Sequence, residues 1–160
     1  MAVLLNDWQG MSGADWQDQT GVVTLPRGAL VRGRRLADHA TPADFSLVLA
    51  EGPVPDWPCR RVRWPDFGVP ADSDDALDAF RDAHRRAYAG ERVEVACRGG
   101  TGRTGTALAA LAVLDGLSPG EAVTWVRSSY NRRAVETISQ RRWLRNVCQP
   151  GRPSSAPNPP

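Results

Sequence analysis

Hydrophobic residues along this chain form short runs at first and longer stretches with helical spacing further on. Four runs, at 21–25, 29–32, 45–50 and 92–96, are short and mostly apolar, which is typical of strands. Residues 60–64 alternate basic and apolar side chains, as an exposed strand would. We therefore expect these five segments to form short strands.

The longer stretches predict helices. Residues 72–89 place apolar side chains near helical spacing and carry acidic residues in the first turn. The stretch 104–114 is apolar nearly all round, which predicts a buried helix. The segment 118–130 opens on a capping box with proline at its first helical position, and 137–147 supplies a final helix. This order of strands and helices predicts an α/β domain with a central sheet.

The whole pattern fits one domain, which we place at 1–150, because 160 residues suffice to bury a core. Residues 151–160 (GRPSSAPNPP) are rich in Pro and Ser and predict a disordered tail. The longest apolar run, 107–114, is too short to cross a bilayer, and residues 1–10 lack the basic start of a signal peptide. We expect a cytoplasmic protein with no membrane span.

The basic residues limit the reaction mechanisms that are open to this chain. All twenty are arginine, which excludes mechanisms that need a lysine, such as Schiff-base chemistry and the phosphate-binding lysine of nucleotide-binding loops. Abundant Arg, Ala and Pro indicate a high-GC bacterial genome. The formal net charge of +2 gives no case for a nucleic-acid partner.

The cysteines indicate a single reactive thiol rather than a metal site. Cys59, Cys97 and Cys148 are too far apart for the paired spacing of a zinc site, and the chain has only two histidines. We expect no metal and no other cofactor, and a reducing compartment.

One segment carries the densest chemistry: Cys97-Arg98-Gly99-Gly100-Thr101-Gly102-Arg103-Thr104-Gly105, between a predicted strand and the buried helix. A glycine-rich turn there can direct backbone N–H groups into one concavity, and the helix adds the positive end of its dipole. Such a site binds phosphate and favours the thiolate of Cys97. Arg103 can grip two phosphate oxygens, and Thr104 can donate its hydroxyl hydrogen to the sulfur. The predicted phosphate-binding residues are Arg98, Gly99, Gly100, Thr101, Gly102 and Arg103.

Two other interpretations of this loop are open at this point. A nucleotide-binding loop, Gly-x4-Gly-Lys-[Ser/Thr], would need Gly where Cys97 stands and Lys where Arg103 stands, so both required positions fail. A structural glycine-rich turn with a buried, inert cysteine also fits, because free cysteine often behaves as a small hydrophobic residue.

The pattern Cys97-x5-Arg103-Thr104-Gly105 resembles the signature of the protein tyrosine phosphatase superfamily. The resemblance implies that Cys97 attacks phosphorus and that Arg103 binds the phosphate. It also implies an α/β fold, a mixed central sheet flanked by helices, with the site at the loop between sheet and helix. The family usually has His before the cysteine, where this chain has Ala96, and the chain length is closer to compact dual-specificity members.

A second motif, WPDFGVP at 64–70, precedes the cysteine loop. Its residues alone describe a proline-flanked turn after a strand. The motif is very similar to the general-acid loop of the same family. The resemblance implies that Asp66 protonates the leaving group and then activates water as a base, with Trp64 and Pro65 as hinges.

Residues 136–140 resemble the family's Gln-Thr-x-x-Gln segment more loosely. Gln140 matches the second glutamine, which implies that it positions the hydrolytic water. Glu136 stands where the first glutamine is usual, and an ordinary helix start also explains Glu136-Thr137.

These residues predict a metal-independent phosphomonoesterase that works through a phosphocysteine, with phosphotyrosine as the first expected substrate and dual specificity open. Its partner is then a phosphorylated protein or a small phosphomonoester, and the oligomeric state stays open. One alternative is a non-catalytic phosphate-recognition module (a pseudophosphatase). Another is a phosphoinositide or inositol phosphate phosphatase, favoured by the extra charge of Arg98. A sulfurtransferase or arsenate reductase also uses a cysteine loop, but neither explains Asp66.

Overall fold

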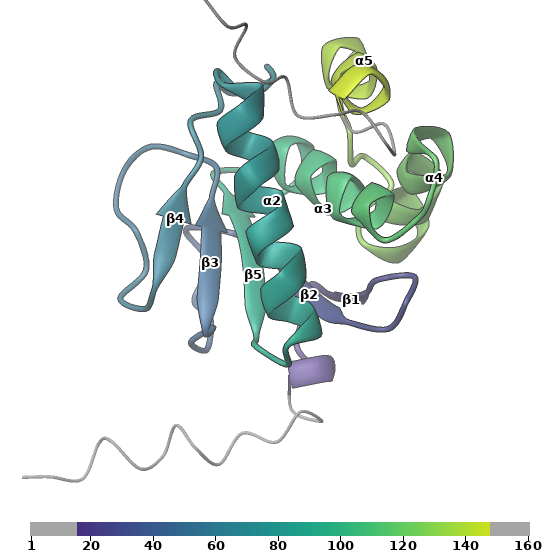
Figure 1. Cartoon of the computed structure of the whole chain (residues 1–160). Coiled ribbons are helices and arrows are strands. Elements are labelled where there is room, and N and C mark those ends of the chain that lie inside the picture. The colour runs from purple at the N-terminus through teal and green to yellow at the C-terminus, as the bar shows by residue number, and fades with distance from the viewer. Residues whose placement is uncertain (1–15, 148–160) are drawn as a thin grey trace, which may run out of the picture.

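The computed structural model describes residues 16–147, so the predicted tail at 151–160 lies outside the described residues. Five strands form one sheet in the order β1-β2-β5-β3-β4 (Figure 1). Their bounds are Val22–Thr24 (β1), Leu30–Arg35 (β2), Phe45–Val48 (β3), Cys59–Arg61 (β4) and Val93–Cys97 (β5). β1 runs antiparallel to β2, and all other neighbours are parallel. The predicted α/β fold with a mixed central sheet is confirmed.

The helices α2 to α5 are Ser73–Tyr88 (α2), Gly102–Leu114 (α3), Pro119–Ser129 (α4) and Ile138–Val147 (α5). In Figure 1 α2 crosses in front of the sheet, and α4 and α5 pack against α3. α2 and α3 lie against the same face of the sheet, because their apolar side chains share one core with Val31, Leu47 and Val95. Within residues 16–147, no helix combines the length and the apolar character that a membrane crossing needs.

α3 is the central helix, and residues 103–113 are all buried, as the sequence predicted. It begins at Gly102, two residues before the predicted start at Thr104. The glycine-rich loop already forms the first helical turn, because the N–H of Gly105 donates to the carbonyl of Thr101 at 2.8 Å. The loop therefore ends at the positive end of the helix dipole.

β4 ends at Arg61, three residues before the predicted end at Trp64. Trp64 turns into the core instead, where only 4% of its surface is exposed. Its ring centroid lies 6.2 Å from that of Phe80 and 5.7 Å from that of Trp143. Burying a large aromatic side chain in such a cluster outweighs the extension of an edge strand. The same turn anchors the start of the segment 64–70, the acid loop.

Side chains cap the starts of α2 and α4, and the cap of α4 is the one that the sequence predicted. The Asp72 side chain accepts hydrogen bonds from the N–H groups of Asp74 and Asp75, at 3.0 and 3.1 Å. Ser118 and Glu121 form the predicted capping box at the start of α4. Each cap satisfies N–H groups that have no partner inside their helix.

A buried ion cluster lies on the other face of the sheet, because side chains alternate along β5. Glu94 is fully buried and accepts hydrogen bonds from Arg32 at 2.8 Å, from Arg34 at 2.6 Å and from Ser46 at 2.7 Å. Burial alone would raise the pKa of Glu94, but the hydrogen bond from Arg34 and the charge of Arg32 outweigh it and hold that pKa below its ordinary value. These bonds join β2, β5 and β3 in one register.

Candidate active site

Cys97 ends β5, and the segment 97–103, the phosphate loop, leads directly into α3. The Cys97 sulfur accepts two hydrogen bonds, one from the N–H of Gly100 at 3.1 Å and one from the hydroxyl of Thr104 at 2.9 Å. The contact that the sequence predicted for Thr104 is therefore present. Donors aimed at a sulfur stabilise the thiolate rather than the thiol.

The three glycines of the phosphate loop differ in how strictly the structure requires glycine at each position. Gly100 has φ of +70°, and a Cβ there would lie 2.8 Å from the backbone nitrogen of Arg35, so only glycine fits. At Gly102 a Cβ would lie 3.1 Å from the carboxylate of Glu136. A Cβ at Gly99 would meet nothing within 4 Å. The close curvature of the loop therefore depends on Gly100 most of all.

Arg103 is buried in the first turn of α3, with 6% of its surface exposed. One terminal nitrogen, Nη1, donates to the carbonyls of Leu49 at 2.9 Å and Trp64 at 3.0 Å. Its Nε is buried and has no hydrogen-bond partner among the described residues. The guanidinium is thus held at Nη1, while Nη2 is paired with Asp66 at 3.4 Å. A phosphate group that binds the edge formed by Nε and Nη2 would replace this ion pair.

The acid loop holds Asp66 in a tight turn. The N–H of Gly68 donates to the carbonyl of Pro65 at 3.0 Å, and Phe67 takes a φ of +58°, which is strained for an aromatic residue. A side-chain oxygen of Asp66 lies 3.4 Å from Nη2 of Arg103. The turn that the residues alone predicted is therefore present, and it brings the carboxylate of Asp66 to the guanidinium of Arg103.

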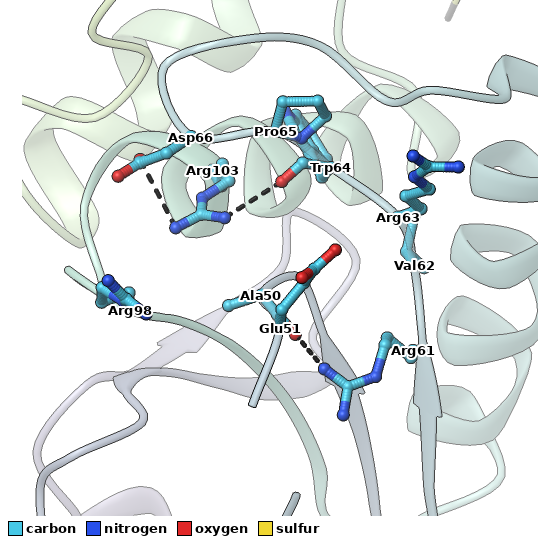
Figure 2. Close-up of a pocket in the computed structure, with 10 residues that line it drawn as sticks. All are labelled: Ala50, Glu51, Arg61, Val62, Arg63, Trp64, Pro65, Asp66, Arg98 and Arg103. Carbon is cyan, nitrogen blue, oxygen red and sulfur yellow. Dashed lines mark hydrogen bonds and ion pairs between the residues drawn. The ribbon is translucent and has the colours of Figure 1, made fainter. Parts of the chain in front are cut away.

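A cavity of about 450 Å³ is lined by residues of both loops and, on its other side, by residues 50–51 and 61–63 (Figure 2). Trp64 and Pro65 contribute apolar surface, and Asp66, Arg98 and Arg103 contribute charged groups. The Arg98 side chain is exposed at this cavity rather than turned into the protein. Residues distant in sequence thus meet at one opening.

The segment 136–140 lies against both loops, but its two candidate residues differ in position. Gln140 is fully buried, and its side-chain nitrogen donates to the carbonyl of Gly68 at 3.2 Å. Trp64 donates to the same carbonyl at 2.7 Å. Glu136 is exposed, with its carboxylate beside Gly102. In this conformation Gln140 supports the acid loop, and its water-positioning role stays a prediction.

Two residues that support the site, Arg127 and Tyr130, were not predicted from the sequence. Arg127 of α4 donates to the carbonyls of Ala134 at 3.0 Å and Val135 at 3.1 Å, and thereby holds a turn in which Val135 has a φ of +59°. Tyr130 donates its hydroxyl hydrogen to the carbonyl of Gly100. No motif marks either residue, because both act on backbone atoms of segments distant in sequence.

Within the described residues, no group of three or more His, Cys, Asp or Glu side chains is placed to hold a metal ion. That the chain needs no cofactor stays a prediction.

Comparison with known families decides the identity of this loop arrangement. A family model described as protein-tyrosine phosphatase matches residues 57–147. The chain belongs to the protein-tyrosine phosphatase family. The matched range includes the acid loop, the phosphate loop and the segment 136–140, so the predicted family membership is confirmed.

The chain is also similar to individual proteins of this family. It is 36% identical over 89 residues to the human tyrosine-protein phosphatase non-receptor type 4, a match that covers 52% of this chain and 10% of that protein. The chain thus spans about a tenth of the length of this curated relative. The crystal structure of Tk-PTP in the active form is similar, with a TM-score of 0.60, 30% identity, and coverage of 66% of this chain and 78% of that one.

A more distant structure shares the fold of this family member. The kinase associated phosphatase, solved with its catalytic-site cysteine replaced by serine, has a TM-score of 0.64 and 15% identity. The match covers 79% of this chain and 91% of that chain.

Proposed function

We propose that this chain hydrolyses phosphate monoesters, phosphotyrosine first among them, through a phosphocysteine on Cys97. The observation that carries the proposal is the environment of the sulfur. Gly100 and Thr104 donate hydrogen bonds to it at 3.1 and 2.9 Å, and Arg103, at the end of the same loop, keeps one guanidinium edge without a protein partner at Nε. A structural, inert cysteine would not need this set of donors.

In the first step, the Cys97 thiolate attacks phosphorus. A sulfur–phosphorus bond forms, the ester phosphorus–oxygen bond breaks, and its electron pair goes to the leaving oxygen. Asp66, in its protonated form, donates a proton to that oxygen. The distance of 3.4 Å between Asp66 and Arg103 supports this assignment, because the proton donor and the phosphate-binding group share one opening.

In the second step, water attacks phosphorus in the phosphocysteine. The Asp66 carboxylate accepts a proton from this water, and the sulfur–phosphorus bond breaks with its electron pair returning to Cys97. Thr104 stabilises the departing thiolate through its hydroxyl, which lies 2.9 Å from the sulfur. Inorganic phosphate leaves, and the enzyme returns to its starting protonation state.

Arg103 supports both steps by preorganisation. Because its Nη1 is held by two backbone carbonyls, at 2.9 and 3.0 Å, the guanidinium does not have to reorient when charge develops on the phosphate oxygens. Donors fixed in a largely buried site stabilise that charge more than mobile donors in water do.

The cavity supports an aryl phosphate as substrate. Its volume of about 450 Å³ and the exposed apolar surface of Pro65 suit an aromatic ring next to the phosphate. Phe67, 63% exposed, adds apolar surface in the acid loop. The curated relative is named a tyrosine-protein phosphatase, in agreement with this substrate class.

The test measures phosphate release from matched phosphotyrosine, phosphoserine and phosphothreonine peptides and from a soluble inositol phosphate, in the presence of EDTA. We expect turnover of the phosphotyrosine peptide, with kcat/KM highest for it. Cys97→Ser should abolish turnover and retain peptide binding. Acid quench of the wild-type enzyme should trap phosphate on Cys97, detected by mass spectrometry.

The same experiment separates the alternatives. Turnover by Cys97→Ser would remove Cys97 as nucleophile. Tight binding of phosphopeptide by the wild type with no phosphate release between pH 5 and 8 would identify a recognition module instead. A higher kcat/KM for the inositol phosphate would refute the phosphotyrosine assignment while keeping the chemistry.

A further inference from the structure

Tyr130 lies directly behind the phosphate loop. It follows the last residue of α4, and its hydroxyl donates to the carbonyl oxygen of Gly100. The N–H of Gly100 in turn donates to the Cys97 sulfur at 3.1 Å. A single residue therefore connects the tyrosine hydroxyl to the proposed nucleophile.

The carbonyl that accepts from Tyr130 belongs to the peptide between Gly100 and Thr101, so the tyrosine orients this peptide. In a trans peptide the carbonyl and the following N–H point in opposite directions. With the Gly100 carbonyl turned to Tyr130, the N–H of Thr101 must point away from Tyr130. The φ of +70° at Gly100 allows this orientation, and the backbone of Arg35 leaves no space for a side chain there.

The ring of Tyr130 packs directly against Gly33 of β2. A Cβ at Gly33 would lie 2.6 Å from Cε2 and 2.7 Å from Cζ of Tyr130, so the strand needs glycine at this point for the ring to approach. Burial raises the pKa of Tyr130, and the charge of Cys97 raises it further, so the hydroxyl stays protonated and remains a donor.

We propose that Tyr130 is a positioning residue for the phosphatase reaction. Its hydroxyl fixes the Gly100–Thr101 peptide, which orients the N–H of Thr101 toward the phosphate and holds Gly100 in place. The N–H of Gly100, in the preceding peptide, then stays directed at the Cys97 sulfur. The inference rests on the proposed function. Tyr130 touches no reacting atom and acts through the backbone of the loop.

The test variant is Tyr130→Phe, which keeps the ring against Gly33 and removes only the hydroxyl. We expect inhibition by phosphate and by vanadate to weaken about three- to tenfold, and kcat/KM to fall by a similar factor, the scale of one hydrogen bond. We also expect the pH midpoint for alkylation of Cys97 by iodoacetamide to move to higher pH. A loss of general stability alone would not move this midpoint.

The matched control is Tyr88→Phe. Its hydroxyl donates to Asp115 at 2.8 Å, just beyond the last residue of α3 and so at the opposite end of that helix from the phosphate loop. We expect unchanged alkylation and unchanged phosphate inhibition in this variant, even if its stability falls.

A second variant keeps the Tyr130 hydroxyl but fills the space on β2 in which the ring lies. Gly33→Ala places a methyl group where the Tyr130 ring lies, which displaces the ring from Gly100. We expect the same weakening of phosphate inhibition, and little additional weakening when Gly33→Ala is combined with Tyr130→Phe, because both remove one interaction. Thermal unfolding of each variant checks that it is folded.

Each outcome is decisive. If Tyr130→Phe matches the wild type in alkylation midpoint and within twofold in phosphate inhibition, the positioning role is refuted, while wild-type turnover still supports the proposed function. If the wild type hydrolyses no phosphomonoester, the proposed function fails. A shifted alkylation midpoint in Tyr130→Phe then still supports the effect of the hydroxyl on the loop.

Discussion

Replacing Arg103 by lysine keeps the positive charge and removes the planar fork. The arginine performs two tasks at once, because Nη1 binds the carbonyls of Leu49 and Trp64 while Nε has no protein partner. A lysine has a single nitrogen, so it can take either the position between the carbonyls or the position at the phosphate.

Each choice has a calculable cost. A lysine that stays with the carbonyls deprives the phosphate of two charge-assisted hydrogen bonds, each worth about 1.5–3 kcal/mol. That is about 3–6 kcal/mol of transition-state stabilisation, or about 10²- to 10⁴-fold in kcat/KM. A lysine that moves to the phosphate leaves two buried carbonyls unpaired, at about 1–3 kcal/mol of folding stability each.

The assay therefore pairs kinetics with unfolding. We expect Arg103→Lys to lose kcat/KM for an aryl phosphate by at least about a hundredfold, or to lose at least about 2 kcal/mol in urea unfolding. Arg81→Lys, on the exposed face of α2, is the matched control and should change neither. An Arg103→Lys enzyme within tenfold of wild-type kcat/KM and with wild-type stability would refute the double role of the guanidinium.

Three further variants test other parts of the site and fold. Asp66→Asn should slow hydrolysis of alkyl phosphates by about a hundredfold or more and slow p-nitrophenyl phosphate less, since a good leaving group needs less protonation; equal effects on both substrates would remove Asp66 as the acid. Gln140→Leu removes one of the two side-chain donors to the carbonyl of Gly68 and should lower kcat for alkyl phosphates several-fold with little change in KM; a change confined to KM would contradict a role in supporting the acid loop. Because the pKa of Glu94 lies below its ordinary value of 4.5, its carboxylate stabilises the fold above that pH, and this contribution is lost as pH falls through the lower pKa of the folded state. Glu94→Gln should therefore cost about 3–5 kcal/mol of unfolding free energy at pH 7 and clearly less near pH 3, a difference that urea titrations at the two pH values measure.

Much of this fold could be predicted from periodicity alone. The amphipathic pattern of 72–89 and the uniformly apolar 104–114 gave α2 and α3 to within two residues, because each helix buries side chains at a regular spacing. The predicted strand at 60–64 was too long, since the sequence does not reveal that Trp64 packs with Phe80 and Trp143. Tertiary packing, which the local pattern does not contain, decides where such a strand stops.

Some residues of the site could likewise be predicted from the sequence, and others could not. Cys97, Arg103 and Thr104 could be predicted because they lie within eight successive residues whose chemistry is readable in order. Tyr130 could not, because its contact to Gly100 depends on a glycine in β2 and on where α4 ends. Contacts to backbone carbonyls leave no residue-type signal at the acceptor position, so a sequence pattern cannot identify them.

The two fixed carbonyls of the acid loop set a limit on how Asp66 can move. The carbonyl of Trp64 is held by Arg103, and that of Gly68 is held by the side chains of Trp64 and Gln140. The two carbonyls are four residues apart, which is about 13–14 Å at full extension. Ordering residues 65–67 costs about 3–6 kcal/mol at most, at about 1–2 kcal/mol for each backbone unit. A substrate therefore has to order only this short segment to bring the proposed proton donor over the scissile bond.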